Sequence, residues 1–291
     1  MDTLQSIVMN GEVFYKIPDA HLMRPFFMSI VSDSNHWLFV SSNGGISAGR
    51  KNPELALFPY YTDDKIADTA ETTGSKTLLR VTKNGQTILW EPFSIRSEGS
   101  FEITRNLYQN RFGNKVIFEE INHDLGLGFQ YEWNTSNLYG FVKQSRLVNL
   151  SEETLDIALV DGLQNLMPYG VPSDLQTKTS NLANAYKRTE LVAETGLAFF
   201  ALSAIIVDKA EPSEALKTNV AWSTGLSAPV YLLSSLQLPR FRQGAKLVQE
   251  TDIKGEKGAY FVASHCTLEA GTSQDWMMVA NVNQTQAAVV A

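Results

Sequence analysis

The stretch RNLYQNRFGNKVIFEEINHDLGLGFQYEW, residues 105–133, predicts three successive β-strands joined by short turns. The turns contain Gly113-Asn114 and Asn122-His123-Asp124, and glycine, asparagine and aspartate are residues that tight turns favour. Strands that follow one another through short turns are typical of antiparallel sheets rather than of alternating strands and helices. This stretch therefore predicts a fold built from large antiparallel sheets.

The same pattern extends in both directions along the chain. Residues 76–94 form the clearest hairpin, because Asn84-Gly85 tolerates the positive φ angles of a type I′ turn. One helix is predicted at residues 173–188, with Ser173 as its N-cap and Leu175, Leu182 and Tyr186 on one face. Further strands are expected at residues 12–17, 26–32, 139–148, 154–160, 191–194, 198–207, 218–224, 230–236, 259–264 and 276–282.

The fold class that follows is all-β. We predict a large antiparallel super-β-sandwich with one or two short helices, in a single domain over residues 1–291. Residues 265–290 read as strand, turn and strand, and no polar tail follows them. We expect from this that the domain is the N-terminal part of a longer protein.

A second informative stretch is HWLFVSSNGGISAGRKNPELALFPYYTDDKI, residues 36–66. Its first residues predict a strand buried on both faces, and Asn43-Gly44-Gly45 predicts a turn. The rest is interpreted as a long ordered loop, pinned by aromatic residues and stiffened by Pro53 and Pro59. Aromatic faces beside charged and amide groups suit a hydroxyl-rich ring such as a sugar. The residues predicted to bind substrate are Arg50, Asn52, Tyr60, Tyr61, Asp63 and Asp64. The alternative is that this loop is only a packed connection at the edge of a sheet.

Composition limits the partners and the cellular location. The net charge of −7 and the absence of a basic run disfavour nucleic acid. The most apolar stretch, residues 197–207, is too short to span a bilayer as a helix, so no membrane contact is expected. The single Cys266 excludes an intramolecular disulfide and a zinc site built from cysteines, and no histidine or carboxylate cluster has metal-ligand spacing. We expect a cytoplasmic protein without a cofactor or a metal.

With these pieces placed, the sequence resembles the N-terminal super-β-sandwich domain of cellobiose and chitobiose phosphorylases and related glycoside-processing enzymes, a galactose mutarotase-like fold. The resemblance is carried by FVSSNGGISAGRKNPELALFPYYTDD at 39–64, by the hairpins at 105–133, by SRLVNLSEETLDIALVDGLQNLMPYGV at 145–171 and by TLEAGTSQDWMMVANV at 267–282. It implies that catalytic residues lie in a following (α/α)6 barrel and that none lies here. The partners it implies are an oligosaccharide and the C-terminal barrel of the same chain, with a homodimer as a further option.

Three functions remain open. The leading one is a non-catalytic carbohydrate-associated domain of a glycoside phosphorylase or hydrolase, which shapes a substrate cleft or packs on the barrel. The second is a free-standing aldose 1-epimerase, which would use a histidine and a carboxylate for proton transfer, so His36, His123 and His265 are its candidates. The third is a purely structural or dimerisation module. Glu119-Glu120 cannot act as paired acids, because adjacent strand residues point to opposite faces.

Overall fold

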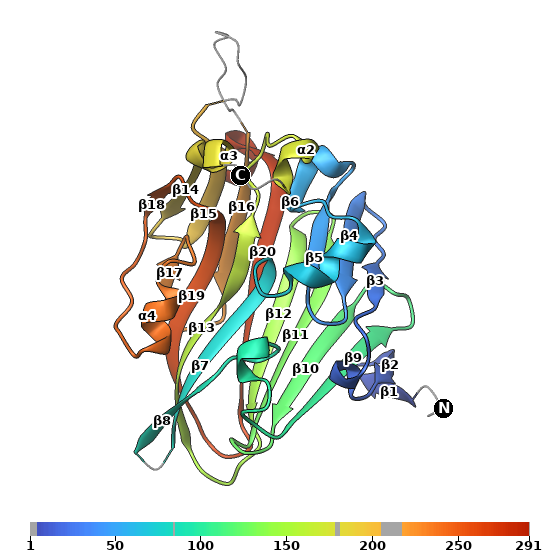
Figure 1. The fold of residues 1–291 in the computed structure, drawn as a ribbon, viewed down its shortest axis with the longest axis vertical. Coiled ribbons are helices and arrows are strands. Elements are labelled where there is room, and N and C mark those ends of the chain that lie inside the picture. Colours follow the sequence, from blue (N-terminus) through green and yellow to red (C-terminus); the bar gives the residue numbers. More distant parts are fainter. Residues whose placement is uncertain (1–4, 84, 178–180, 205–216, 291) are drawn as a thin grey trace.

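A computed structural model describes residues 5–83, 85–177, 181–204 and 217–290. All three sheets are antiparallel (Figure 1). The largest has eleven strands, in the order β1 (Gln5–Met9), β2 (Glu12–Ile17), β9 (Ile103–Asn110), β10 (Val116–Asn122), β11 (Leu127–Ser136), β12 (Gly140–Asn149), β20 (Ser273–Thr285), β16 (Lys217–Thr224), β15 (Leu197–Leu202), β14 (Lys187–Val192) and β18 (Asp252–Lys254).

Two smaller sheets lie against this large one. The five-stranded sheet has the order β17 (Val230–Leu232), β19 (Gly258–Leu268), β13 (Leu155–Leu166), β7 (Gly74–Lys83) and β8 (Gln86–Trp90). The four-stranded sheet has the order β3 (Phe27–Ile30), β4 (His36–Ser41), β5 (Ile46–Arg50) and β6 (Ala56–Phe58). In Figure 1, β7, β13 and β19 cross in front of the large sheet, and β3 to β6 lie beside them at the upper right.

The helices within the described ranges are short, and none of them is long and apolar enough to cross a membrane. The α-helices are α1 (Asp63–Ile66), α2 (Ser173–Gln176), α3 (Asn181–Ala185), α4 (Leu238–Arg242) and α5 (Gln286–Val290). The 3-10 turns are η1 (Ala20–Leu22), η2 (Pro53–Leu55), η3 (Ala67–Thr69) and η4 (Ile95–Ser97). The predicted all-β architecture is confirmed.

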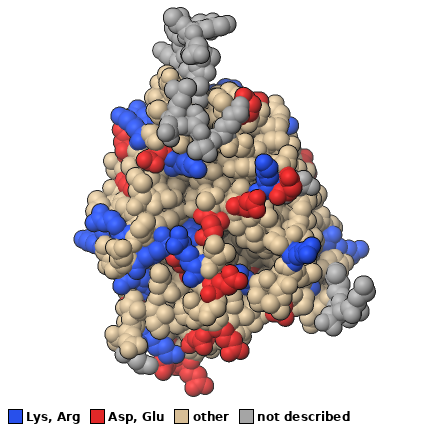
Figure 2. Space-filling view, in the orientation of Figure 1, with Lys and Arg blue, Asp and Glu red and all other residues tan. Residues whose placement is uncertain are grey.

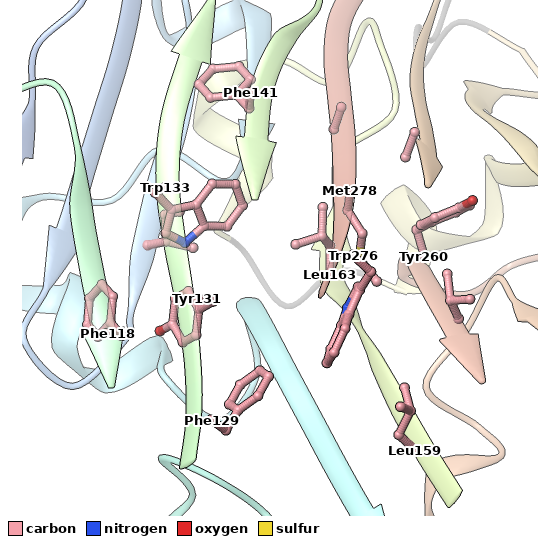
Figure 3. Packing of buried hydrophobic residues seen from close by; sticks show 14 of the residues in the cluster. Phe118, Phe129, Tyr131, Trp133, Phe141, Leu159, Leu163, Tyr260, Trp276 and Met278 are labelled. Atoms are coloured by element: carbon pink, nitrogen blue, oxygen red, sulfur yellow. The ribbon is translucent and has the colours of Figure 1, made fainter. Parts of the chain in front are cut away.

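The core lies between the large sheet and the two smaller sheets. On β11, Phe129, Tyr131 and Trp133 are buried at alternate positions, as a strand with one face against a core requires. They belong to one apolar cluster with residues of β13 and β20, among them Leu159 and Trp276 (Figure 3). The two layers therefore form a β-sandwich with a continuous apolar interior.

An ion pair lies inside this apolar interior. The Nζ of Lys143 on β12 is 2.6 Å from Oδ1 of Asp161 on β13, and both side chains are fully buried. Asp161 also accepts hydrogen bonds from Thr77 Oγ1 at 2.7 Å, Ser145 Oγ at 3.1 Å and Trp276 Nε1 at 2.7 Å. Burial lowers the pKa of Lys143, while the nearby carboxylate opposes that effect. This cluster joins the large sheet to the five-stranded sheet.

Two local predictions need correction. The predicted helix at 173–188 is wrong: α2 is capped by Pro172 rather than Ser173, and the chain enters β14 at Lys187. Lys187 and Thr189 are buried at alternate positions and β14 pairs with β15, so sheet pairing decides this segment. Leu182 lies in α3, but its side chain is outside the described part.

The other correction concerns the stretch 36–66, whose middle was interpreted as an irregular loop. It contains β5 and β6, which extend the sheet begun by β3 and β4. The hairpin at 76–94 is confirmed as β7 and β8, although Asn84 of its turn lies outside the described residues. The expected strand at 198–207 is β15 as far as Leu202, and its last three residues also lie outside them.

Candidate functional site

Four aromatic rings follow one another on the four-stranded sheet and the segment after it. The ring centroids of Phe27 and Phe39 are 5.4 Å apart, those of Phe39 and Trp37 are 5.9 Å apart, and those of Trp37 and Tyr60 are 5.5 Å apart. Phe27 is 46% exposed and Tyr60 is 39% exposed, while the two rings between them are half-buried. We call these four residues the aromatic strip.

The strip arises from the alternation of β4. Leu38 and Val40 point into the core and are fully buried, so Trp37 and Phe39 point to the outer face of the sheet. The sequence predicted a strand buried on both faces, and this is wrong for the outer face, which is only partly covered. A row of neighbouring, partly exposed rings on a sheet is a preformed apolar surface, in which the Trp37 and Tyr60 rings meet edge-on at 86°.

Neighbouring groups fix the Trp37 side chain. A Cβ on Gly49 would lie 2.4 Å from Trp37 Cζ2 and 2.4 Å from the carbonyl oxygen of Leu55, so only glycine fits beneath the indole. The indole Nε1 donates a hydrogen bond to the carbonyl oxygen of Asn52 at 3.3 Å. The backbone N–H of Tyr60 donates to Oε1 of Gln176 at 2.9 Å, which holds the neighbouring ring in place. The strip is therefore preorganised.

Arg50 lies at the end of β5 and faces away from the strip. It alternates with Gly49, and its guanidinium donates to Oδ1 of Asn35 at 2.8 Å, of Asn281 at 3.3 Å and of Asn137 at 3.4 Å. The contacts to Asn137 and Asn281 join the four-stranded sheet to the ends of the large sheet, while Asn35 lies in the segment between β3 and β4. Burial lowers the pKa of Arg50. The pKa of His36, its partner on β4, is lowered to about 4, mainly by burial and also by the charge of Arg50.

The structure brings only some of the predicted binding residues together. Tyr60 belongs to the strip, and Asn52 is exposed beside it. Tyr61 is half-buried, and its pKa is raised by burial. Asp64 accepts a hydrogen bond from Thr62 Oγ1 at 2.6 Å near the start of α1. Asp63 is the first residue of α1, and its side chain is outside the described part.

Sequence reasoning missed Phe27, Trp37 and Phe39 as surface residues. A usable signal was present, because Gly49 and Ser47 alternate on the strand opposite Trp37 and Phe39. Small residues opposite two aromatic residues leave room for the rings against the sheet, as Gly49 does for Trp37. That inference requires the pairing of β4 with β5, which the sequence did not indicate.

The four histidines do not form a shared catalytic centre within the described residues. Nε2 of His265 lies 2.9 Å from Oδ1 of Asp156, but both side chains are at least half exposed on the five-stranded sheet. Nε2 of His123 lies 2.8 Å from Thr104 Oγ1, and His36 packs edge-on against Phe141 at 5.0 Å. No group of three or more histidine, cysteine, aspartate or glutamate residues in these ranges is placed to hold a metal ion.

Comparison with known proteins gives the fold. No family model matches the chain, and no curated protein matches it. Among solved structures, the Slr1438 protein from Synechocystis sp. PCC 6803 is 10% identical with a TM-score of 0.50, and the match covers 90% of this chain and 96% of that one. This likeness shows a shared fold, and it agrees with the super-β-sandwich predicted from the sequence.

Weaker matches include enzymes of carbohydrate metabolism. A candidate aldose 1-epimerase from Escherichia coli K12 is 10% identical with a TM-score of 0.46, and the match covers 89% of this chain and 99% of that one. A polysaccharide lyase is 10% identical with a TM-score of 0.42, and the match covers 90% of this chain. The chain spans about a third of the length of the lyase, at 33%.

Proposed function

We propose that this protein is a non-catalytic carbohydrate-binding β-sandwich and that an oligosaccharide lies along the aromatic strip. The observation that carries the proposal is the row of four neighbouring, partly exposed rings, in which Trp37 is held against Gly49. A sugar ring has apolar C–H faces that pack on aromatic rings, and its hydroxyl groups point outward from those faces. Exposed Asn52 supplies an amide beside Trp37, which suits such hydroxyl groups.

Within this proposal, the predicted binding residues take different roles. Tyr60 stacks on the sugar and Asn52 donates or accepts hydrogen bonds. Arg50 is a positioning residue, because its bonds to Asn137 and Asn281 hold the four-stranded sheet against the large sheet. Tyr61 and Asp64 follow the strip in the chain and would contact a longer ligand, while the predicted role of Asp63 stays a prediction because its side chain is outside the described part.

A non-catalytic role is favoured over an epimerase by the histidines. Proton transfer at a sugar needs an acid and a base within reach of one ligand. His265 and Asp156 are the histidine–carboxylate pair found in the described residues, and they lie on the exposed face of the five-stranded sheet. We further propose, from the sequence resemblance, that the domain works in the cytoplasm beside a catalytic barrel of the same chain, or as a homodimer.

Calorimetric titration of the protein with linear cello-, malto- and chito-oligosaccharides tests the proposal. Trp37→Ala and Tyr60→Ala should each weaken binding about tenfold or more, as truncation of a central aromatic contact does elsewhere. Trp222→Ala is the matched control, because Trp222 is a half-buried tryptophan that contacts Tyr139 edge-on at 6.4 Å, outside the strip. Equal losses in Trp37→Ala and Trp222→Ala, or no binding of any of these sugars, would overturn the proposal. Accelerated interconversion of α- and β-aldoses by the protein would replace it with the epimerase function.

A further inference from the structure

A hollow of about 390 Å³ lies on the outer face of the large sheet. Gln130 and Glu132 of β11 line it, and they alternate along the strand with the core residues Phe129, Tyr131 and Trp133. Because neighbouring side chains of a strand point to opposite faces, the hollow lies on the side of the sheet that faces away from the two smaller sheets. We call it the Glu132 hollow, and its lining includes Met9, Phe14, Ile117, Gln130, Glu132 and Gln144.

The β1–β2 hairpin forms one wall of this hollow. Asn10 and Gly11 at its turn both have positive φ angles, as a type I′ turn requires. Glu12, directly after the turn, accepts hydrogen bonds from Lys115 Nζ and from Asn110 Nδ2. These two donors belong to the connection between β9 and β10, so the tip of the hairpin is fastened to the body of the sheet at the hollow.

The hairpin gives the hollow an apolar side. Phe14, Tyr108 and Ile117 form a small apolar cluster apart from the main core, and Ile7 and Met9 pack against it. Three members of this group, Met9, Phe14 and Ile117, line the hollow. A ligand that enters the hollow therefore meets an apolar wall on the hairpin side.

The other side of the hollow is polar, because strand pairing places polar side chains next to one another. Glu132 lies opposite Gln144 on β12, and Gln130 lies opposite Arg146. Residues paired in this way have Cβ atoms about 4.5–5.5 Å apart. The side-chain amides of Gln130 and Gln144 make no hydrogen bond to another residue in the described ranges, so their oxygen and nitrogen atoms remain available to a ligand.

The cations of the hollow already have acidic partners. Lys115 bonds to Glu12, and Nε of Arg146 lies 3.4 Å from Oδ1 of Asp275. With Glu132, three carboxylates and two cations line the hollow. The hollow therefore carries an excess of one negative charge.

Glu132 is the carboxylate that lacks a cation. Its Oε1 accepts a hydrogen bond from the neutral amide of Asn134 at 2.7 Å, and it forms no ion pair with any residue that the structure describes. The side chain is half-buried, and Oε2 has no partner in these ranges and is not sealed from solvent. A carboxylate in a partly enclosed, partly apolar hollow attracts a cation more strongly than one on an open surface, because the effective dielectric constant is lower.

We propose that the Glu132 hollow binds a small organic cation, whose protonated amine donates to Glu132 and to the side-chain oxygen of Gln130 or Gln144. An ammonium group has three donors and no acceptor, which matches one carboxylate and neighbouring amide oxygens. The apolar body of the cation lies against the wall formed by Met9, Phe14 and Ile117. The volume is at the lower end of the range for small-molecule pockets, which suits a compact molecule. This proposal is independent of the aromatic strip and of carbohydrate binding.

Ligand-observed NMR titration of the whole protein with three probes tests this site. The probes 2-phenylethylamine, 2-phenylethanol and 3-phenylpropanoate share an apolar body and differ in the charge of their polar group. The amine should bind about five- to tenfold more tightly than the alcohol, as expected for a half-buried ion pair, and the carboxylate should bind most weakly.

Two variants locate the binding. Glu132→Gln keeps the shape of the side chain and should lower the affinity for the amine to that for the alcohol. Met9→Ala shortens the apolar wall and should weaken binding of the amine and the alcohol alike, about two- to fivefold. Glu190→Gln is the matched control, because Glu190 is a glutamate of β14, far along the same sheet, that pairs with Arg188 at 2.8 Å.

A loss of amine binding in Glu132→Gln that Glu190→Gln does not share supports the proposal. It is overturned if the amine binds no more tightly than the alcohol, if none of the three probes binds, or if Glu132→Gln and Glu190→Gln weaken amine binding equally. Unchanged binding of the amine and the alcohol in Met9→Ala would overturn the position given to the apolar body.

Discussion

Replacing Lys143 by methionine tests how the two layers of the sandwich are joined. The substitution keeps the volume and apolar stem of the side chain and leaves the carboxylate of Asp161 buried without its cationic partner. Breaking a buried ion pair in this way typically costs about 3–5 kcal/mol. Hydrogen bonds from Thr77, Ser145 and Trp276 to the carboxylate remain, so we expect the lower end, about 3 kcal/mol.

Urea denaturation followed by tryptophan fluorescence measures this loss, with the free energy of unfolding extrapolated to water. At roughly 2 cal/mol/K per residue, a chain of 291 residues has an unfolding entropy of about 0.6 kcal/mol/K, so the same loss lowers Tm by about 5 °C. Adding Asp161→Asn to Lys143→Met removes the unpaired charge and should recover more than about 1 kcal/mol. A Lys143→Met variant as stable as the unchanged protein, or a double variant less stable than Lys143→Met alone, would refute this account of the core.

Three further results are expected. Gly49→Ala should lower the free energy of unfolding by about 1–3 kcal/mol and abolish oligosaccharide binding, because the Cβ of the alanine would occupy the space of the Trp37 ring. Unchanged oligosaccharide binding in the calorimetric titration would show that binding does not require the Trp37 ring in its present position. The pKa of His36 is about 4 in the folded protein and near 6.5 in the unfolded chain, so the unfolded chain binds one more proton between these pH values. The free energy of unfolding should therefore fall by about 1–2 kcal/mol between pH 6.5 and pH 4, a figure reduced for solvent screening because the ring is half exposed. His36→Phe should flatten that part of a plot of urea midpoint against pH, and an unaltered plot would contradict the assignment. Arg242→Ala should cost about 2–3 kcal/mol in urea denaturation, because Glu91 is almost fully buried and would lose both bonds to the guanidinium, at 2.6 and 2.9 Å; a loss under about 0.5 kcal/mol would mean that the remaining partners of Glu91 suffice.

Strand pairing between neighbours in sequence was predictable because its signals are local. Residues 105–133 form β9, β10 and β11 as expected, and Gly113 and Gly126 have the positive φ angles that their turns require. The predicted helix at 173–188 failed for a non-local reason. Gln176 is held by the carbonyl oxygens of Pro53 and Val171, and Lys187 already pairs with Leu202 across β14 and β15.

The candidate site was harder to predict, because its residues come from separated strands. Tyr60 and Asn52 were identified from the aromatic and polar residue types in their stretch alone, and they do lie beside Trp37. Arg50 was assigned to the same surface, but its guanidinium donates to Asn35 between β3 and β4 and to Asn137 and Asn281 at the ends of the large sheet. The face to which a residue points depends on the register of its strand. The sequence of β5 has too few β-branched or aromatic residues for it to be predicted as a strand.

Charge on the face shown in Figure 2 is mixed, with lysines and arginines interspersed among acidic residues rather than gathered into a continuous basic surface. Nucleic acid binding needs clustered cations that replace the counterions of phosphate. On this face, recognition of a ligand therefore has to rely on shape, ring stacking and hydrogen bonds. Ring stacking is the interaction that the aromatic strip offers.

The attachment of the four-stranded sheet makes binding and folding separable. Asn219 of β16 is buried and donates from Nδ2 to the carbonyl oxygens of Ala56 at 3.1 Å and of Met167 at 2.7 Å, which fastens β6 to the body from below. Trp37 packs against the buried cluster of Ala56, Met167, Val171 and Leu202, whereas Tyr60 is 39% exposed. Trp37→Ala therefore removes packing at this attachment as well as a ring of the strip, whereas removal of the Tyr60 ring should change the surface offered to a sugar more than the stability of the sandwich. Loss of binding in Tyr60→Ala with an unchanged urea midpoint would then report directly on recognition.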